Sequence, residues 1–382
     1  MKKINVLVVD DSAFMRKFIS DLLSEDSRLY VTGTARNGED ALKKIRELKP
    51  DVVTMDVEMP VKNGLEALKI IMQEQPLPVV MLSSTTSEGT ENALTAIQYG
   101  AIDFIAKPSG SISLDLDKIK NELISKVISA SEVKRKHLEH FGLNRKISIK
   151  FGNNYSKIEL NETSVLPEKI RKDLDPLVVQ SLALHSKTAG FPLKKLVCIG
   201  TSTGGPRALE RVLTKLPEDL DAGILIVQHM PAGFTKSLAN RLNAMCRISV
   251  EEAQDGDLVK KGTAYIAPGG FHLKVKQTGA NLSLKIDQTE IRNGHRPAVD
   301  VLFESVSCIE GYQKLAVIMT GMGSDGSSGL KTLKEKDRFV KAIAESEETS
   351  IVFGMPKAAI AANLIDEILD VDQIAASIMK FV

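Results

Sequence analysis

The first third of the chain alternates short apolar runs with segments of helical periodicity. The apolar runs predict strands at residues 4–9, 30–35, 51–55, 78–82 and 102–106. Between them apolar residues recur every three or four positions, which predicts helices near 13–24, 38–48, 64–74 and 88–99, and a last helix from Leu116. Strict alternation of strands and helices predicts an α/β domain whose parallel sheet is covered on both faces.

The helical period fades near residue 128, and a second α/β pattern begins at residue 193. Its predicted strands lie near 195–200, 223–228, 263–267, 271–277, 282–287 and 314–319, and its helices near 206–214, 234–246, 297–307 and 326–335. The stretch between the two patterns is polar and mixed, and so long an irregular segment is unusual inside one compact domain. We therefore expect a first domain at 1–128, a linker at 129–192 and a second domain at 193–382.

Composition narrows the class of protein. The 50 Lys and Arg residues nearly balance 49 Asp and Glu residues, so neither a nucleic acid nor an anionic membrane is an expected partner. The three cysteines lie far apart, which predicts neither a zinc site nor a disulfide framework and favours a reducing compartment. No apolar stretch approaches the ~20 residues of a membrane span. We expect a cytoplasmic protein with no direct membrane insertion.

Acidic residues follow two predicted strands of the first domain. Asp10 and Asp11 come after the first strand, and Asp56 comes after the third. The carboxyl ends of parallel strands line one edge of a sheet, so these carboxylates are expected to meet there. Two carboxylates 4 Å apart repel by about 4 kcal/mol at an effective dielectric of 20. A divalent cation relieves this repulsion, and oxygen ligands favour Mg²⁺; the alternative is that Asp10 and Asp11 only cap the next helix.

A hydroxyl and an ammonium group are expected at the same edge. Ser83 follows the fourth strand and Lys107 follows the fifth. A carboxylate held beside a cation and a lysine suits nucleophilic attack on a phosphoryl group. Asp56 is the best candidate nucleophile because it follows the central strand alone, while Asp10 and Asp11 act as a metal-binding pair.

The motifs of the first domain resemble those of response-regulator receiver domains. The matching segments are Asp10-Asp11-Ser12, Asp56-Val57-Glu58-Met59-Pro60, Ser83-Ser84 and Lys107-Pro108. The resemblance implies a flavodoxin-like fold with a five-stranded parallel sheet, and phosphorylation of Asp56 by a histidine kinase. It also implies that Lys107 contacts the phosphoryl group and that Ser83 senses it. Phe104 occupies the aromatic switch position of such domains, and a role as a core residue is the alternative.

A glycine-flanked serine opens the second domain. The strand ending at Ile199 leads into Gly200-Thr201-Ser202-Thr203-Gly204. A strand that feeds G-x-S-x-G and then a helix lifts the serine hydroxyl onto an exposed turn, where helix amides can stabilise an oxyanion. The alternative is a glycine-rich loop that cradles a nucleotide phosphate.

A nucleophilic serine needs a base and a carboxylate that orients the base. His229 ends an apolar strand as Ser202 does, and we favour it over His272, expected to be a partly exposed structural residue, and over His295, a loop residue able to contact substrate. Asp325 lies in a glycine-rich loop after a third buried strand and is the leading carboxylate candidate. Asp300 is less attractive because its surroundings are helical.

The motifs of the second domain, taken with the receiver, resemble the chemotaxis protein-glutamate methylesterase (CheB) family. The matching segments are Ile199–Gly205, Gln228–Pro231, Ile266–Gly269, Arg296–Phe303 and Thr320–Gly326. Thr201 and Ser327 depart from the family pattern, where Ala is usual. The resemblance implies a doubly wound α/β domain with a mostly parallel sheet. It also implies a Ser202–His229–Asp325 triad and an oxyanion site that includes the Met322 amide, with Thr203 beside the nucleophile.

The same resemblance implies the reaction and its partners. The substrates are glutamate γ-methyl esters of methyl-accepting chemoreceptors, with methanol as product, and certain receptor glutamines, which are deamidated. A chemotaxis histidine kinase is the expected phosphodonor, and the ester chemistry needs no cofactor. With Asp56 unphosphorylated, we expect the receiver to lie over the Ser202 crevice. The alternative is a non-catalytic module that binds a nucleotide or a protein through the 200–206 loop.

Overall fold

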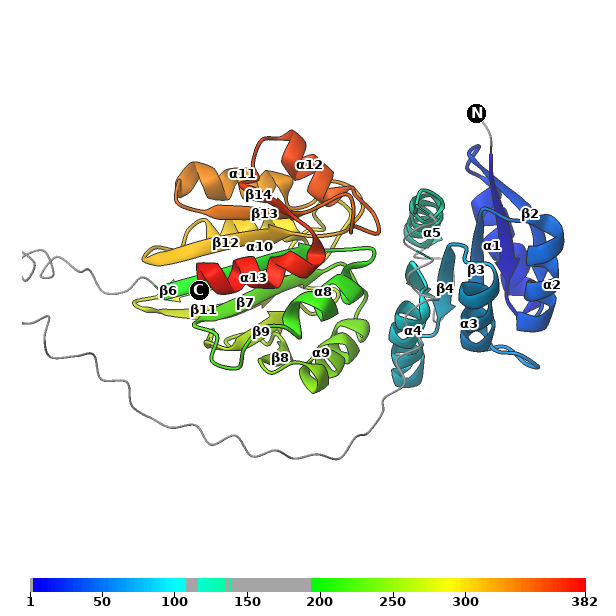
Figure 1. Ribbon diagram of the computed structural model, residues 1–382, viewed down its shortest axis with the longest axis horizontal. Coiled ribbons are helices and arrows are strands. Elements are labelled where there is room, and N and C mark those ends of the chain that lie inside the picture. The colour runs from blue at the N-terminus through cyan, green and yellow to red at the C-terminus, as the bar shows by residue number, and fades with distance from the viewer. Residues whose placement is uncertain (1–2, 108–115, 135–137, 139–193) are drawn as a thin grey trace, which may run out of the picture.

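The computed structural model describes residues 3–107, 116–134, 138 and 194–382. These residues form two α/β units that lie side by side (Figure 1). Most of the predicted linker at 129–192 lies outside the described residues. The last helix of the first unit, α5 (Leu116–Ser131), continues past the position near which its helical period fades. Val133 and Leu138 are buried in the same apolar cluster as Leu123 and Val127 of this helix.

The first unit has a five-stranded sheet in the order β2-β1-β3-β4-β5, and every pairing is parallel. Each predicted strand and helix of this unit is confirmed, with ends that differ by at most one residue. Its elements are β1 (Ile4–Val9), α1 (Ala13–Ser24), β2 (Leu29–Ala35), α2 (Gly38–Leu48), β3 (Val52–Asp56), α3 (Gly64–Glu74), β4 (Val79–Ser83), α4 (Ser87–Tyr99), β5 (Asp103–Ala106) and α5. The central strand is β3, and it ends at Asp56.

The second unit has a seven-stranded parallel sheet in the order β14-β13-β12-β6-β7-β9-β8. The chain winds outward from β6 in both directions, so the predicted doubly wound sheet is confirmed. The elements of this sheet and its covering helices are β6 (Lys194–Thr201), α8 (Gly205–Leu213), β7 (Ala222–Gln228), α9 (Phe234–Met245), β8 (Ser249–Glu252), β9 (Thr263–Ile266), α10 (Val299–Val306), β12 (Tyr312–Ile318), α11 (Ser327–Lys336), β13 (Lys341–Glu345), α12 (Met355–Ala361), β14 (Glu367–Leu369) and α13 (Val371–Phe381). The strands β10 (His272–Thr278) and β11 (Asn281–Asp287) form a separate antiparallel hairpin.

Five elements of the second unit were not predicted: β8, β13, β14, α12 and α13. The strands β8 and β14 are only four and three residues long and lie at the two edges of the sheet, so they carry little apolar signal of their own. The helix α13 does carry a detectable stripe, since its buried residues Val371, Ile374, Ala375 and Ile378 recur at helical spacing. Its sequence pattern was sufficient to predict it.

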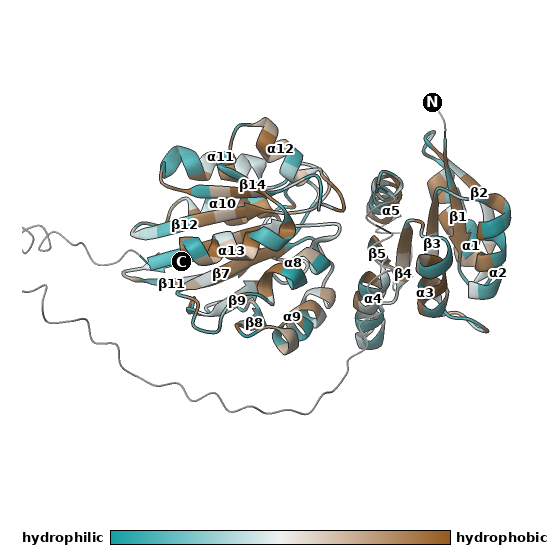
Figure 2. Cartoon of the chain, viewed as in Figure 1, coloured by the Kyte–Doolittle hydropathy of each residue, from teal (hydrophilic) through white to brown (hydrophobic). Residues whose placement is uncertain are grey.

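Apolar residues concentrate on the strands of both sheets, whereas α2 and α11 are largely hydrophilic on their outer sides (Figure 2). The helices α4 and α5 of the first unit face the second unit (Figure 1). The helix α4 packs against α8 and α9 across this boundary. Phe104 of β5 stacks on Phe234 at the start of α9, with ring centroids 4.5 Å apart. Both rings are buried, so the two units share an apolar interface.

Candidate active site and phosphorylation site

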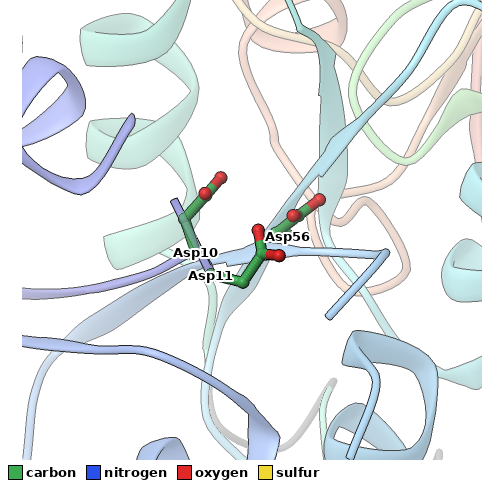
Figure 3. Close-up of side chains that lie close together, drawn as sticks. All are labelled: Asp10, Asp11 and Asp56. Carbon is green, nitrogen blue, oxygen red and sulfur yellow. The ribbon is translucent and has the colours of Figure 1, made fainter. Parts of the chain in front are cut away.

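Three carboxylates gather at the carboxyl edge of the first sheet (Figure 3). One oxygen from each of Asp10, Asp11 and Asp56 lies within 4.8 Å of the others. Ser12, not either aspartate, caps α1 by accepting a hydrogen bond from the Met15 amide. Asp10 and Asp56 are buried, and Asp10 Oδ2 is a buried oxygen without a hydrogen-bond donor. This set of oxygen donors fits a hard divalent cation such as Mg²⁺.

Lys107 brings its ammonium group to the same carboxylates. Its Nζ lies 2.7 Å from Asp56 Oδ2, and 3.1 Å from Asp10 Oδ2 without hydrogen-bond geometry. Burial raises the pKa of Asp56 to about 6, Lys107 opposes this rise, and the charge of Asp10 adds to it. Three carboxylates at this edge carry more negative charge than the single ammonium group of Lys107 neutralises. Such an excess of negative charge favours the binding of a cation.

Ser83 and Phe104 connect this edge to the boundary between the units. The Ser83 hydroxyl is buried and donates a hydrogen bond to the Gly89 carbonyl in α4, over 2.7 Å. Phe104 lies in β5, next to the strand that carries Ser83, and stacks on Phe234 of the second unit. A displacement of the Ser83 hydroxyl would therefore act on α4, a helix that contacts α8 and α9.

In the second unit Ser202, His229 and Asp325 follow three adjacent strands. The strand β6 lies between β12 and β7. The Ser202 amide donates to the Thr320 carbonyl beyond β12, and the His229 amide donates to the Thr201 carbonyl at the end of β6. The order of the strands and these two hydrogen bonds bring the predicted residues to one edge of the sheet.

The serine turn is held by close backbone packing and by Gln228. Gly204 has a φ of +79°, a conformation that favours glycine. A Cβ on Gly205 would lie 2.0 Å from Gln228 Oε1. Gln228 is buried, accepts a hydrogen bond from the Thr201 hydroxyl, and donates to the carbonyls of Ser202 and His229. Gln228 appeared only as part of a family motif, and its role in joining the serine turn to the histidine strand was not predicted.

Asp325 and His229 form a buried pair. His229 Nε2 lies 2.8 Å from Asp325 Oδ2. Asp325 also accepts hydrogen bonds from the amides of Val299 and Asp300, which begin α10, and from Asn293 Nδ2. Burial opposes ionisation of Asp325, but the hydrogen bond and charge of His229, together with the hydrogen bonds from Val299 and Asn293, outweigh burial and lower the pKa of Asp325. The carboxylate is therefore anionic and fixed, as a residue that orients an imidazole must be.

The second nitrogen of His229 is available. Its Nδ1 is buried and has no hydrogen-bond partner, and within the described residues the Ser202 hydroxyl makes no hydrogen bond to the His229 ring. Catalytic hydrogen bonds are often long when no substrate is bound, so the lack of a Ser202–His229 hydrogen bond is compatible with catalysis. The structure thus joins two of the three predicted residues directly and brings the third to the same edge of the sheet.

The other two histidines of this unit have different surroundings. The His295 ring stacks on His229, with centroids 3.8 Å apart and an interplanar angle of 11°. Burial, together with neighbouring His229, lowers the pKa of His295 to about 3, so His295 is neutral at physiological pH. His272 is fully buried, and its Nε2 contacts the Glu290 carbonyl. The expectation of a partly exposed His272 was wrong, because β10 turns this side chain into the protein.

The first unit covers the loops around Ser202. The Thr203 hydroxyl donates a hydrogen bond to Asp103 Oδ2 at the start of β5. The Met322 sulfur accepts hydrogen bonds from the hydroxyls of Ser129 and Ser125 in α5. In the described part of the chain, the amide groups of Thr203 and Met322 donate to no backbone carbonyl. The side chains of both residues are therefore held by the first unit, while both amides are left for another acceptor.

Lys126 reinforces this contact from α5. Its Nζ lies 3.2 Å from Asp103 Oδ1 and 3.0 Å from Glu122 Oε1, and donates a hydrogen bond to the Phe104 carbonyl. Burial would lower the pKa of Lys126, but the two carboxylates outweigh burial and raise it. Asp103 is thus held between a charged lysine on its own unit and a hydroxyl on the other.

Comparisons with known proteins agree with the two-part architecture. Residues 197–378 match the family model described as CheB methylesterase, and residues 6–116 match the one described as response regulator receiver domain. No helix in the described residues is long and apolar enough to cross a membrane.

Two relatives resemble the chain over almost its whole length, and one solved structure matches about half of it. A protein-glutamate methylesterase/protein-glutamine glutaminase of Geobacillus kaustophilus (strain HTA426) is 55% identical over 100% of this chain and 99% of its own. One of Bacillus subtilis (strain 168) is 50% identical over 99% of this chain and 98% of its own. The crystal structure of the Thermotoga maritima CheB methylesterase catalytic domain is 43% identical, with a TM-score of 0.48, and the match covers 49% of this chain and 98% of that one.

Proposed function

The chain belongs to the CheB family of protein-glutamate methylesterases/protein-glutamine glutaminases, and from this premise we propose how its own residues carry out and regulate the reaction. The reaction is hydrolysis of glutamate γ-methyl esters on chemoreceptors, with release of methanol, and deamidation of receptor glutamines. Ser202 is the nucleophile, His229 is the general base and acid, and Asp325 orients His229. The observation that carries this assignment is the buried His229–Asp325 pair. It leaves Nδ1 of His229 without a partner, and His229 lies beside the turn that carries Ser202.

The chemistry follows from the free nitrogen. Because Asp325 engages Nε2, that nitrogen carries the proton and Nδ1 is the acceptor. Ser202 Oγ attacks the ester carbonyl while its proton passes to His229 Nδ1. The same proton then moves to the methoxide oxygen as the carbon–oxygen bond breaks and methanol leaves. Water repeats the sequence on the acyl-enzyme and releases a glutamate carboxylate; a glutamine substrate loses ammonia in place of methanol.

The developing oxyanion needs donors that point to one place. We assign the free amides of Thr203 and Met322 to this role, since they flank Ser202 on two different loops. Removal of one such donor typically reduces kcat by about 100- to 1,000-fold. In the closed arrangement the Thr203 hydroxyl and the Met322 sulfur both bind the receiver, so substrate has no access to these loops.

Phosphorylation of Asp56 is the proposed release signal, with a chemotaxis histidine kinase as donor. Asp10, Asp11 and Asp56 would hold Mg²⁺, which neutralises phosphoryl charge when bound. Lys107 contacts the phosphoryl oxygens from its present position beside Asp56. Ser83 turns from the Gly89 carbonyl toward the phosphoryl group, and α4 follows. The interface between α4, α8 and α9 is thereby weakened, and the receiver leaves the Ser202 loops.

The test of this mechanism is the rate of methanol release from methylated chemoreceptors. These receptors are membrane proteins, and we expect the enzyme to act on them from the cytoplasm. The Ser202→Ala variant should release methanol at a rate near background. Ser328→Ala, which alters an exposed serine of α11 outside the site, serves as the matched control and should retain the wild-type rate. Equal turnover in wild type and Ser202→Ala would contradict the mechanism.

The alternative is a non-catalytic module that binds a nucleotide or a protein through the 200–206 loop. In that case His229 and Asp325 would have no catalytic role, and a fluorophosphonate probe for activated serines should fail to label the wild-type chain. Labelling that is lost in Ser202→Ala but kept in Ser328→Ala supports the esterase.

A further inference from the structure

The buried carboxylates of Asp325 and Asp300 lie side by side next to His229. Asp325 precedes α11 and caps α10, whereas Asp300 lies in the first turn of α10 and caps α11. Asp325 accepts hydrogen bonds from the Val299 and Asp300 amides at the start of α10, over 2.6 and 3.2 Å. Asp300 Oδ1 accepts hydrogen bonds from the amides of Gly326 and Gly329 at the start of α11, over 2.9 and 2.6 Å. This reciprocal capping fixes the two helices relative to each other and forces two acidic groups together.

The proximity of these carboxylates disfavours their joint ionisation. Burial raises the pKa of Asp300, and the charge of Asp325 raises it further, against the opposing effect of its amide donors. Protonation of Asp325, or its movement away from Asp300, would relieve this repulsion but would weaken the hydrogen bond between Asp325 and His229. A donor placed between the two groups relieves the repulsion without removing either charge.

Asn293 is that donor. Its Nδ2 lies 2.8 Å from Asp300 Oδ2 and 3.0 Å from Asp325 Oδ1, so one N–H serves each carboxylate. Both neighbours are acceptors, which determines that the amide nitrogen, and not the oxygen, faces them. The amide is neutral and therefore adds no charge to the cluster.

The turn that carries Asn293 is built for this position. The backbones of Arg292 and His295 exchange two hydrogen bonds, of 3.1 and 2.8 Å, across Asn293 and Gly294. Asn293 has a φ of +53°, a left-handed conformation that Asn, Asp and Gly tolerate better than other residues. The same turn ends at His295, which stacks on His229. One short turn thus contacts both members of the His229–Asp325 pair.

We propose that Asn293 is a positioning residue for catalysis, an inference that rests on the esterase function proposed above. Its amide binds Asp325 Oδ1 and Asp300 Oδ2 together, which keeps Asp325 Oδ2 directed at His229 Nε2. Without it, Oδ1 of Asp325 retains only the longer bond from the Asp300 amide. The carboxylate is then held less firmly, by the Val299 and Asp300 amides alone, and the imidazole is less precisely oriented toward Ser202.

Two substitutions distinguish the effect of the Asn293 side-chain amide from that of its left-handed backbone conformation. Asn293→Asp keeps the shape and the left-handed conformation but replaces both donors by acceptors. Asn293→Gly removes the side chain and keeps the conformation. Asn363 offers matched controls, because it too is a positive-φ asparagine, at +56°, and is exposed at the end of α12. Asn363→Asp and Asn363→Gly apply the same changes away from the triad.

The measurement is methanol release by the full chain, with kcat and KM determined from pH 5 to 9 and active sites counted with the fluorophosphonate probe. Each Asn293 variant should lose about tenfold or more in kcat per active site, with KM within about twofold of wild type. The titratable groups that contact His229 are Asp325 and His295; Asp300 lies next to Asp325, and the charge of Lys126 acts on His295. A third carboxyl group in Asn293→Asp joins a cluster whose joint ionisation is already disfavoured, so this cluster binds a proton at higher pH and the acidic limb of the rate profile should move to higher pH.

Several results would overturn this inference. If kcat per active site and the acidic limb match wild type, Asn293 is only structural. If KM alone rises, Asn293 contacts substrate and does not act through Asp325. If Asn293→Asp does not fold, kcat and KM of Asn293→Gly decide the question alone. Failure of the esterase function itself looks different, since wild type and Ser202→Ala would then release methanol equally.

Discussion

The hydroxyl of Thr203 donates a hydrogen bond to the carboxylate of Asp103, which lies 100 residues earlier in the chain. Thr203 follows the proposed nucleophile, and Asp103 begins the last strand of the receiver sheet. A receiver side chain is thereby attached to the loop that would stabilise the oxyanion. This contact gives the proposed inhibition a specific residue, in addition to the coverage provided by α4 and α5.

Loss of the Asp103 carboxylate should raise unstimulated activity. In Asp103→Ala the Thr203 hydroxyl loses its acceptor, while Lys126 keeps Glu122 as a partner. Hydrogen bonds to charged groups contribute about 1.5–3 kcal/mol, so the closed state should become at least about tenfold less favoured. Methanol release without phosphodonor should rise accordingly and approach the stimulated rate.

The matched control for this prediction is Asp21→Ala. Asp21 is an exposed receiver aspartate that pairs only with Lys17 in the described residues and lies on α1, away from the boundary. Its basal rate should equal that of wild type. A basal rate in Asp103→Ala that stays at the wild-type level, in protein whose circular dichroism is unchanged, would show that this contact does not restrain the enzyme.

Glu345 should make the stability of the catalytic domain depend on pH. It is buried at the end of β13 and accepts hydrogen bonds from the Thr320 amide and the Thr349 hydroxyl. Burial raises its pKa to about 7 from the ordinary value of 4.5, so the folded state holds a proton that the unfolded state releases. The group's contribution to stability is therefore complete below pH 4.5 and is lost as the pH rises to about 7.

Glu345→Gln removes this titration and keeps a neutral side chain of the same shape. Between pH 5 and pH 8 the free energy of unfolding of wild type should fall, relative to the variant, by on the order of 2–3 kcal/mol. Urea unfolding at the two pH values measures the difference. Glu335→Gln, at an exposed glutamate of α11, should show no such difference. Parallel pH dependence in wild type and Glu345→Gln would contradict the buried, protonated state.

Removal of divalent cations should abolish stimulation without reducing basal activity. In the proposed mechanism the three clustered aspartates need a cation to accept a phosphoryl group, whereas the ester chemistry of Ser202, His229 and Asp325 needs none. With a chelator present, a small acyl phosphate should leave the methanol release rate at its basal value, and excess Mg²⁺ should restore the increase. Loss of basal activity in the chelator would instead place a metal in the ester chemistry.

Strand ends could be predicted from the sequence because buried parallel strands are continuous apolar runs with polar residues directly after them. That pattern identified Asp56, Ser202, His229 and Asp325 and predicted that they would lie at sheet edges. It also gave both sheets, apart from the short edge strands β8 and β14, which are held by their neighbours, and the five-residue inner strand β13. The local sequence was sufficient to predict a site residue wherever the end of a single strand determined its position.

Contacts between distant elements could not be predicted in the same way. Asp103 carries no mark in the sequence that distinguishes it from any aspartate before a strand, and its partner Thr203 belongs to the other domain. Asn293 was not predicted as a site residue. Its role depends on Asp300 and Asp325, which meet only when α10 and α11 pack together. The free nitrogen of His229 likewise follows from side-chain geometry that periodicity does not encode.

The central claim is that a phosphoryl group on Asp56 releases the esterase site. The most direct measurement is the rate of methanol release with and without a small acyl phosphate and Mg²⁺, in wild type and in Asp56→Asn. Wild type should be stimulated, and Asp56→Asn should keep the basal rate and show no stimulation. Equal stimulation of both proteins would contradict the account, because activation would then not depend on phosphorylation of Asp56.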